Sequence, residues 1–321
     1  MDILLFSFAL KMMWAQVLFL IIGIVVVLKS ADWLTSGAVG LATRLGISQI
    51  VIGLTIVAIG TSMPEFFVSV VSAIKGTPDL AVGNIVGSNI FNVLLIVGVA
   101  AIVTPIRVQR NTVRRDIPIA IVASIMLMVM MLDDTISRMD ALILFAAFIA
   151  FIWTTLRCSK NSSQENNTQK KAIATWKSTI FILVGLIGLV VGSNIFVDNA
   201  SSLAHGLGIS DAIIGLTIVA GGTSLPELAT SAVAARKGDS GIAIGNVLGS
   251  NVFNILMIVG LTGLISPMHI QGITYVDMAV MVISMVLFWL FSFTNLRIER
   301  WEGCVLILCL FGYLTWLVSN V

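Results

Sequence analysis

Charged side chains are scarce in this chain of 321 residues, because they make up only 11% of the sequence, whereas a soluble domain carries about 25%. Hydrophobic residues make up 58%, and the mean hydropathy is +1.06. This balance excludes an ordinary water-soluble fold, and it excludes an intrinsically disordered chain, which needs the opposite composition. One membrane span takes about 20 apolar residues. The length and composition therefore predict an all-α polytopic membrane protein.

Cysteine and histidine are also rare, with three cysteines and two histidines in the whole sequence. The cysteines form no CxxC pair and the histidines stand far apart, which excludes the common thiolate and HExxH zinc sites. A formal net charge of +2 is too small to favour nucleic acid as a partner. The sequence has no recognisable nucleophile–base pair or nucleotide-binding loop, so we expect neither an enzyme nor a bound cofactor.

Apolar runs separated by short polar breaks predict ten transmembrane helices, five in each half of the chain. A polar segment at 158–175 reads as a flexible linker between the halves 1–157 and 176–321. The expected spans lie near residues 15–35, 45–75, 80–104, 115–133, 138–157, 176–204, 209–235, 242–265, 274–294 and 301–319.

The two halves contain a repeat. Segments 53–105 and 215–267 align without a gap, so that Thr61 corresponds to Thr223 and Asn92 to Asn254, and 29 of the 53 positions are identical. The identical positions include Thr, Ser, Pro, Glu and Asn, which two unrelated apolar helices rarely share. We therefore predict a duplication with one α-repeat in each half.

Five spans is an odd number, so the second half must enter the membrane inverted relative to the first. With the amino terminus outside, the loops on the cytoplasmic side would hold 14 of the 18 Lys and Arg residues, as the positive-inside rule requires. We therefore expect both termini outside the cell and the 158–175 linker in the cytoplasm. Inverted repeats of this kind are typical of secondary transporters, whose sites lie near the midplane between the repeats.

Each repeat places one glutamate deep inside an apolar span. Glu65 ends the segment GTSMPE, and Glu227 ends its copy GTSLPE. A carboxylate at the centre of a bilayer costs about 2.5–3.5 kcal/mol on insertion scales, so it must face the protein interior and a cation, a proton or a polar partner. Two such carboxylates at matching positions predict a cation site between the halves.

A proline precedes each glutamate and adds a second feature to this motif. Pro64 and Pro226 have no N–H group and clash with the carbonyl four residues earlier, so we expect each helix to bend and to expose carbonyl oxygens. Thr61 and Thr223 lie four residues before the glutamates, so we expect each hydroxyl on the same helical face as the carboxylate of its own repeat.

The second shared motif, GNxxGSNxFN, covers residues 83–92 and 245–254. Its polar residues recur every four positions and predict one polar stripe on each helix, formed by Asn84, Ser88 and Asn92 and by Asn246, Ser250 and Asn254. Placed against the glutamates, the stripes would complete a cage of oxygen ligands, which suits a hard cation such as Ca²⁺. Two ionised glutamates would neutralise one divalent cation.

At these residues the chain resembles the cation/Ca²⁺ antiporter superfamily, and within it the sodium/calcium exchanger branch. The branch carries a GTSxPE segment and a GNxxGSN segment in each of two α-repeats, and both occur twice here in that order. The short central linker is similar to that of compact prokaryotic members. The resemblance implies the sodium/calcium exchanger fold, with ten helices in two inverted repeats of five. It also implies that the first spans of the halves, near 15–35 and 176–204, slide against a fixed core.

The resemblance further implies roles for individual residues. Glu65 and Glu227 would bind Ca²⁺ directly, helped by Thr61 and Thr223. The sodium sites would use the hydroxyls of Ser62, Ser88, Ser224 and Ser250 and the backbone oxygens of Ala58 and Ala220. Asn92 occupies the matching polar position of repeat one. Asn254 stands where some well-studied members carry an aspartate, so this site has one acid fewer than theirs.

Exchange of Ca²⁺ for Na⁺ across the cell membrane by alternating access is the first hypothesis for function, with the lipid bilayer as the surrounding medium. A proton-coupled exchanger, in which the same glutamates bind H⁺, is the second hypothesis. A passive cation channel with the polar stripes as its filter is a third. An intramembrane hydrolase using Ser62 or Ser224 is the least favoured, because the repeats hold no histidine to activate a serine. The sequence defines no oligomeric partner.

Overall fold

The computed structural model describes residues 2–159, 174–206 and 220–319, and the described chain is almost entirely helical. The elements of the first half are α1 (Asp2–Leu45), α2 (Gln49–Ile52), η1 (Gly53–Val57), α3 (Ala58–Thr61), α4 (Met63–Ile74), α5 (Pro78–Phe91), η2 (Asn92–Val97), α6 (Gly98–Val103), β1 (Ile106–Arg107), η3 (Thr112–Asp116), α7 (Ile117–Met130), η4 (Met131–Asp133), β2 (Thr135–Ile136) and α8 (Arg138–Ser159). The η elements are π-helical turns, except η4, which is a 3₁₀ turn.

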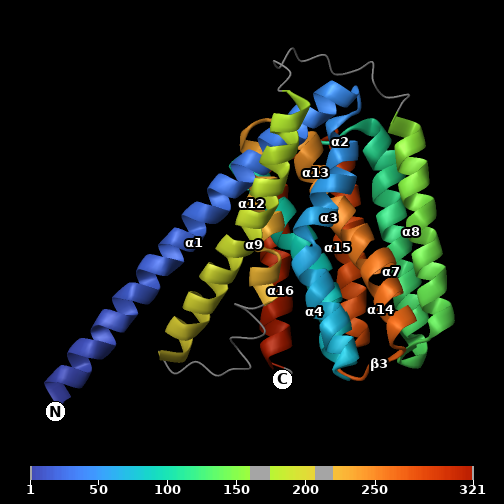
Figure 1. Ribbon diagram of the computed structural model, residues 1–321. Coiled ribbons are helices and arrows are strands. Elements are labelled where there is room, and N and C mark those ends of the chain that lie inside the picture. Colours follow the sequence, from blue (N-terminus) through green and yellow to red (C-terminus); the bar gives the residue numbers. More distant parts are fainter. Residues whose placement is uncertain (1, 160–173, 207–219, 320–321) are drawn as a thin grey trace.

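The second half follows the same order. Its described elements are α9 (Thr175–Gly206), α11 (Ala220–Thr223), α12 (Leu225–Arg236), α13 (Ser240–Val252), η6 (Phe253–Val259), α14 (Gly260–Ile265), β3 (Met268–His269), α15 (Tyr275–Phe293), β4 (Arg297–Ile298) and α16 (Arg300–Ser319). Figure 1 shows these helices as a tall bundle, with α1 and α9 slanting across one side of it.

Nine of the ten expected spans are found within the described residues. Eight are helices that are long and apolar enough to cross a membrane, and the ninth is the bent pair Gln49–Thr61 and Met63–Ile74. The remaining expected span, near 209–235, has its first part outside the described residues, and α11 and α12 form the rest of it. The first span is longer than expected, because the candidate segment runs from Trp14 to Leu45.

The predicted bend lies one residue before the Met-Pro-Glu step. The two parts of the bent span meet at 48°, and Ser62 between them leaves the helical conformation with φ −83° and ψ 10°. Ser224 does the same in the second half, with φ −86° and ψ 5°. The prolines explain both breaks, since Pro64 and Pro226 then occupy the first turn of a new helix, where a missing N–H group costs nothing.

Two short antiparallel pairings join the halves. Strand β1 pairs with β4, and β2 pairs with β3. Under the alignment of the two halves, β1 corresponds to β3 and β2 corresponds to β4. The inverted duplication therefore converts one pairing into the other. Each pairing joins one strand of the first half to one strand of the second half.

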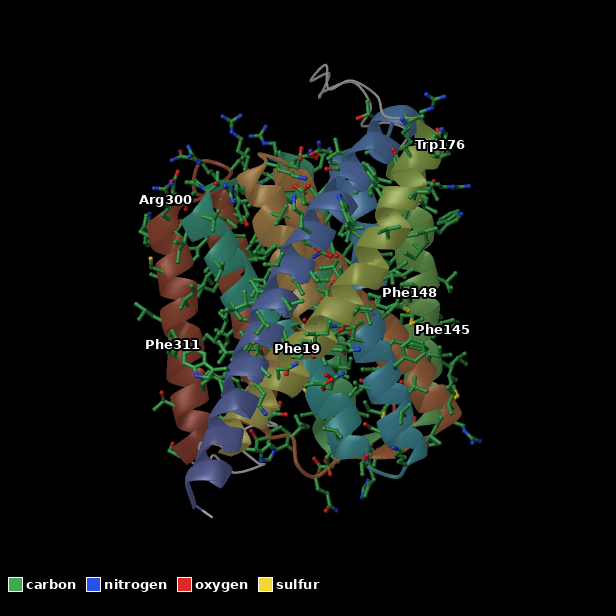
Figure 2. All side chains as sticks on the ribbon, turned by 60° about the vertical axis from the view of Figure 1, so that its left-hand side comes forward. Phe19, Phe145, Phe148, Trp176, Arg300 and Phe311 are labelled. Carbon is green, nitrogen blue, oxygen red and sulfur yellow. The ribbon has the colours of Figure 1, made fainter. Side chains whose placement is uncertain are left out.

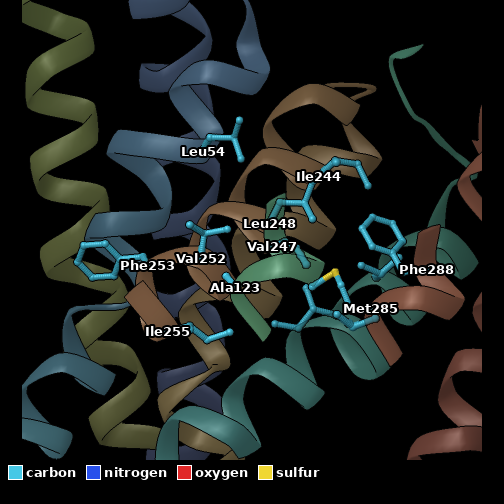
Figure 3. Packing of buried hydrophobic residues seen from close by; sticks show 14 of the residues in the cluster. Leu54, Ala123, Ile244, Val247, Leu248, Val252, Phe253, Ile255, Met285 and Phe288 are labelled. Atoms are coloured by element: carbon cyan, nitrogen blue, oxygen red, sulfur yellow. The ribbon is translucent and has the colours of Figure 1, made fainter. Parts of the chain in front are cut away.

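Burial divides the helices into a core and a periphery. In the span Ser240–Ile265, 94% of the most apolar window is buried, against 22% in Arg300–Leu317. Figure 3 shows buried side chains of this core, among them Val247 and Leu248 of α13, which belong to one hydrophobic cluster with Met285 and Phe288 of α15. α13 therefore forms the centre of the bundle.

The outer helices turn large apolar side chains away from the bundle. Figure 2 shows Phe19 on α1, Phe311 on α16 and Trp176 on α9 pointing outward. These three side chains are 50%, 61% and 63% exposed. Exposed apolar surface on long apolar helices is what a hydrocarbon environment requires.

Glycines allow α1 and α9 to pack closely along their length. A Cβ atom on Gly23 would lie 2.9 Å from the amide nitrogen of Phe196, and one on Gly185 would lie 2.8 Å from that of Leu34. Gly23 and Gly185 are equivalent positions when the alignment of the two halves is extended to these helices. Small residues at such crossings let membrane helices approach backbone to backbone.

A valine at Gly245 tests the packing at the centre of the bundle. A Cβ there would lie 2.6 Å from the carbonyl oxygen of Ile50 and 2.9 Å from Cα of Gly53, and both are backbone atoms that cannot move aside. We expect Gly245→Val to lower stability by about 1–3 kcal/mol, the usual cost of overpacking, seen as a fall of several degrees in the apparent Tm in detergent. Gly312→Val, whose Cβ meets no atom of the described residues within 4 Å, should leave the Tm nearly unchanged. Equal Tm values for the two variants would contradict the packing described here.

Candidate functional site

The two motif glutamates lie at the two helix breaks, in the interior of the bundle. Glu65 lies in the first turn of α4 and Glu227 in the first turn of α12, and each is only 1% exposed. The amino-terminal end of a helix carries a partial positive charge that favours a carboxylate. Each break therefore both fixes and partly stabilises the glutamate that follows it.

Each carboxylate accepts a hydrogen bond from the serine at the break of the other half. The Ser62 hydroxyl donates to Oε1 of Glu227 over 2.9 Å, and the Ser224 hydroxyl donates to Oε1 of Glu65 over 3.3 Å. Ser224 Oγ also lies 3.3 Å from the hydroxyl oxygen of Ser88 on α5. The two halves are thus joined at the site by reciprocal contacts.

Each threonine interacts with the carboxylate of the other half. Thr61 interacts with Glu227, and Thr223 interacts with Glu65. Each threonine therefore has a partner in the other half that its spacing did not indicate, while the shared helical face of Thr61 and Glu65 stays a prediction. The bend at Ser62 lies between Thr61 and Glu65.

No positive side chain balances these two acids among the described residues. The ion pairs of that part of the chain join Lys237 to Asp32 and Arg297 to Glu299, both away from the site. Oxygen Oε2 of each glutamate is buried and accepts no hydrogen bond from any residue that the structure describes. The described residues also contain no cluster of three or more His, Cys, Asp or Glu side chains. Two carboxylates among neutral oxygen atoms form a site that requires a cation or a proton, since a buried unpaired charge is costly.

Asn84 and Asn246 fix the backbone at the glutamates. The Asn84 amide nitrogen donates to the carbonyl of Glu65 over 3.2 Å and to the hydroxyl of Ser69 over 3.0 Å. Asn246 makes the equivalent bonds in the second half, over 3.3 Å to Glu227 and over 3.0 Å to Ser231. The stripes at 84–92 and 246–254 therefore face the glutamate-bearing helices, as their spacing predicts.

Asn92 and Asn254 lie one turn beyond the serines, where α5 and α13 pass into the π-helical turns η2 and η6. Each is 1% exposed, and its Oδ1 atom is buried without a hydrogen-bond partner among the described residues. Turns of π-helix often mark functional sites, because they interrupt the regular hydrogen-bond ladder. Each side chain thus adds an unused acceptor oxygen to the polar stripe of its helix.

The other residues that the sequence singled out lie in the same region. Ala58 is fully buried, and its carbonyl oxygen accepts a bond from the amide of Ser62. Ser250 is fully buried and lies beside Glu227. Ala220 is the first residue of α11. Sequence reasoning missed Asn89 and Asn251, the third residues of the two GSN triplets, whose position one residue after Ser88 and Ser250 placed them off the expected stripe.

Comparison with known proteins covers nearly the whole chain. The family model described as sodium/calcium exchanger protein matches residues 15–157 and 177–319. The sodium/calcium exchanger MaX1 of Methanosarcina acetivorans is 32% identical, over 94% of this chain and 98% of the relative. The inner membrane protein YrbG of Escherichia coli is 36% identical, over 93% of this chain and 94% of the relative.

Solved structures of the sodium-calcium exchanger NCX_Mj have the same fold. A structure soaked with 2.5 mM Na⁺ and 0.1 mM Ca²⁺ matches with a TM-score of 0.82 and 32% identity, over 94% of this chain and 98% of that chain. Another, soaked with 10 mM Na⁺ and no Ca²⁺, matches with a TM-score of 0.83 and 33% identity, over 94% and 99%. The ten-helix exchanger fold expected from the sequence agrees with this similarity.

The substitution Asn246→Leu tests whether the hydrogen bonds of Asn246 stabilise the site. Asn246 is fully buried, donates to Glu227 and Ser231, and accepts a bond from Thr61 over 3.0 Å. Leucine has the same number of side-chain heavy atoms in a similar branched shape, but it makes none of these three hydrogen bonds. We therefore expect Asn246→Leu to destabilise the protein by about 1–3 kcal/mol, measured as a lower apparent Tm. Asn199→Leu is the matched control, because within the described part of the chain the Asn199 amide nitrogen donates to the carbonyl of Ile195 in its own helix and to no other group. A Tm for Asn246→Leu as high as that of the control would refute this role.

Proposed function

Because this chain belongs to the sodium/calcium exchanger protein family, as the family model and its relatives establish, we propose that it exchanges Ca²⁺ for Na⁺ across the cell membrane. Movement of Ca²⁺ against another cation is the activity of the family, and coupling to Na⁺ is the specific part of the proposal. The names of MaX1 and of NCX_Mj, and the Na⁺ and Ca²⁺ soaks of the latter, support Na⁺ as the counter-ion.

The observation that carries the proposal is the pair formed by Glu65 and Glu227. Both acids are buried, each accepts a hydrogen bond from the other half, and each keeps one oxygen unused. Their combined charge of −2 matches one Ca²⁺ or two Na⁺. Ca²⁺ takes six to eight oxygen ligands, and the surrounding hydroxyl, carboxamide and backbone oxygens are of the required kind.

Exchange follows from the electrostatics of this pair. Without a cation, two like charges would share a site of low dielectric constant, which is unfavourable. A carrier built on such a pair changes sides readily only when loaded, so Ca²⁺ leaves when another cation takes its place. A conformational change limited to the loaded carrier couples the two ion gradients.

The residues of the proposed cation site come from both halves. Glu65 and Glu227 bind Ca²⁺ with Thr61 and Thr223, and the Na⁺ positions use Ser62, Ser88, Ser224, Ser250, Ala58 and Ala220, with Asn92 and Asn254 beside them. The amide at Asn254 adds an oxygen ligand without adding charge. The site therefore has a maximum charge of −2 from its acids.

The proposed orientation places both termini outside and the 158–175 linker in the cytoplasm. The excess of Lys and Arg in the loops of that side supports it. We also propose that α1 and α9 move together during alternating access. Their close glycine-lined contact and their position at the side of the bundle support this movement (Figure 1).

Replacement of each of the two acids by its neutral amide tests the proposed cation site. Glu65→Gln and Glu227→Gln keep the size of each side chain and remove one charge, so the pair no longer balances Ca²⁺. We expect each variant to lose at least 90% of Na⁺-driven ⁴⁵Ca²⁺ uptake in proteoliposomes. We also expect Ca²⁺ to raise the apparent Tm of the unaltered protein but not of the variants, since only a bound ligand stabilises the fold. Normal uptake by either variant would disprove the two-carboxylate site.

The counter-ion is identified by imposing one gradient at a time. An outward Na⁺ gradient should drive ⁴⁵Ca²⁺ into the vesicles at constant pH, and an outward H⁺ gradient without Na⁺ should not. Uptake that follows only the pH gradient would replace Na⁺ with H⁺ as the coupling ion. Ca²⁺ flux that needs no cation on the opposite side would instead indicate a channel.

A further inference from the structure

We propose that Asn89 and Asn251 are positioning residues, which orient the carboxamides of Asn254 and Asn92 so that their oxygens stay available to the transported cation. The inference rests on the proposed function, because it assigns a role toward the ion of the same site. It concerns two residues that lie outside the expected polar stripes and that contact no carboxylate among the described hydrogen bonds.

The four asparagines form a reciprocal network between α5, α13 and the π-helical turns that follow them. The Asn92 amide nitrogen donates to Oδ1 of Asn251 over 2.8 Å, and the Asn254 amide nitrogen donates to Oδ1 of Asn89 over 3.0 Å. All four side chains are 1% exposed. Each bond joins the GSN triplet of one half to the last asparagine of the motif in the other.

Asn92 and Asn254, the outer asparagines of the network, each keep one polar atom that takes no part in these hydrogen bonds. Oδ1 of Asn92 and Oδ1 of Asn254 are buried and accept no hydrogen bond from the part of the chain that the structure describes. Buried polar atoms are nearly always satisfied, so two equivalent exceptions require a reason. An oxygen that must be free to bind a cation provides one. The helical spacing supports it, since Asn92 lies four residues after Ser88, which contacts Ser224 beside Glu65.

Asn89 and Asn251 decide which way the outer amides point, because their own orientation is constrained. The Asn89 amide nitrogen faces the carbonyl of Asn251 and the Asn251 amide nitrogen faces the carbonyl of Asn89, both over 3.5 Å. Sδ of Met281 also lies 3.9 Å from the Asn89 nitrogen. Flipping either amide, so that its nitrogen and oxygen exchange places, would set the oxygen against a carbonyl oxygen. Each therefore keeps its Oδ1 toward the neighbouring asparagine.

This constraint explains why an amide fits at position 254. Asn89 presents an acceptor to residue 254, so that residue must donate a hydrogen. Asparagine donates through its nitrogen and keeps its oxygen for the ion. An ionised aspartate would set oxygen against oxygen at this contact. Asn89 therefore matches the neutral residue at 254, and with it the maximum charge of −2 at the site.

Double-mutant cycles on the apparent affinity for Ca²⁺ test the assignment. We expect Asn89→Ala to raise the KM for Ca²⁺ by about tenfold, in line with the loss of one buried hydrogen bond, with a smaller effect on the maximal rate. Because Asn89 acts through Asn254, the double variant Asn89→Ala/Asn254→Ala should be no worse than Asn254→Ala alone. The pair Asn251 and Asn92 should behave in the same way.

The control pairs are Asn89 with Asn92 and Asn251 with Asn254, which share a helical segment but no side-chain bond among the described contacts. Their KM effects should multiply. Equal behaviour of bonded and control pairs would overturn the proposal, because a general loss of packing affects both alike. If an alanine variant fails to insert into the membrane, the cycles are repeated with Asn→Ser variants. The serine hydroxyl is too short to reach the partner, so the same difference in KM effects between bonded and control pairs is expected. Absence of Ca²⁺ transport by the unaltered protein would instead disprove the proposed function.

Discussion

The structure depends on one unfavourable arrangement, two carboxylates buried near each other without a positive side chain among the described residues to balance them. Glu65 and Glu227 each lie at the start of a helix and accept a serine hydroxyl from the other half, and in the proposed function a cation or a proton balances their remaining charge. The same cost makes the site suitable for exchange, since removing one ion favours the entry of another. Stability and function are thus linked through the same pair.

Inverted duplication is what brings the pair together. The two glutamate-bearing spans break at equivalent serines, Ser62 and Ser224. In each span the backbone carbonyl of the glutamate accepts a hydrogen bond from an asparagine of the following helix. The pairings β1–β4 and β2–β3 repeat the symmetry on a smaller scale, because the alignment of the two halves converts one pairing into the other. Such an architecture presents equivalent ligands from two sides without a separate binding domain.

Much of this was predictable from the sequence, because the informative residues are costly in a membrane. An acid in an apolar span, a proline before it and polar residues every four positions predict the buried carboxylates, the helix break and the polar stripes, while cation binding there stays a prediction. The exchange of partners between halves was not predictable. Helical spacing places Thr61 near Glu65 but gives no indication that Thr61 also contacts Glu227 in the other half. Asn89 and Asn251 also escaped the periodicity, because their contacts depend on how α5 and α13 cross.

The central claim is that Glu65 and Glu227 hold a single divalent cation between them. A crystal structure of the protein with Sr²⁺ as a heavier substitute for Ca²⁺, located by anomalous scattering, tests it most directly. The account predicts one strong peak within about 2.3–2.7 Å of an oxygen of each glutamate, close to the distances usual for Ca²⁺. A peak that contacts only one of the two carboxylates, or one bound elsewhere while both remain paired with the serines, would contradict it.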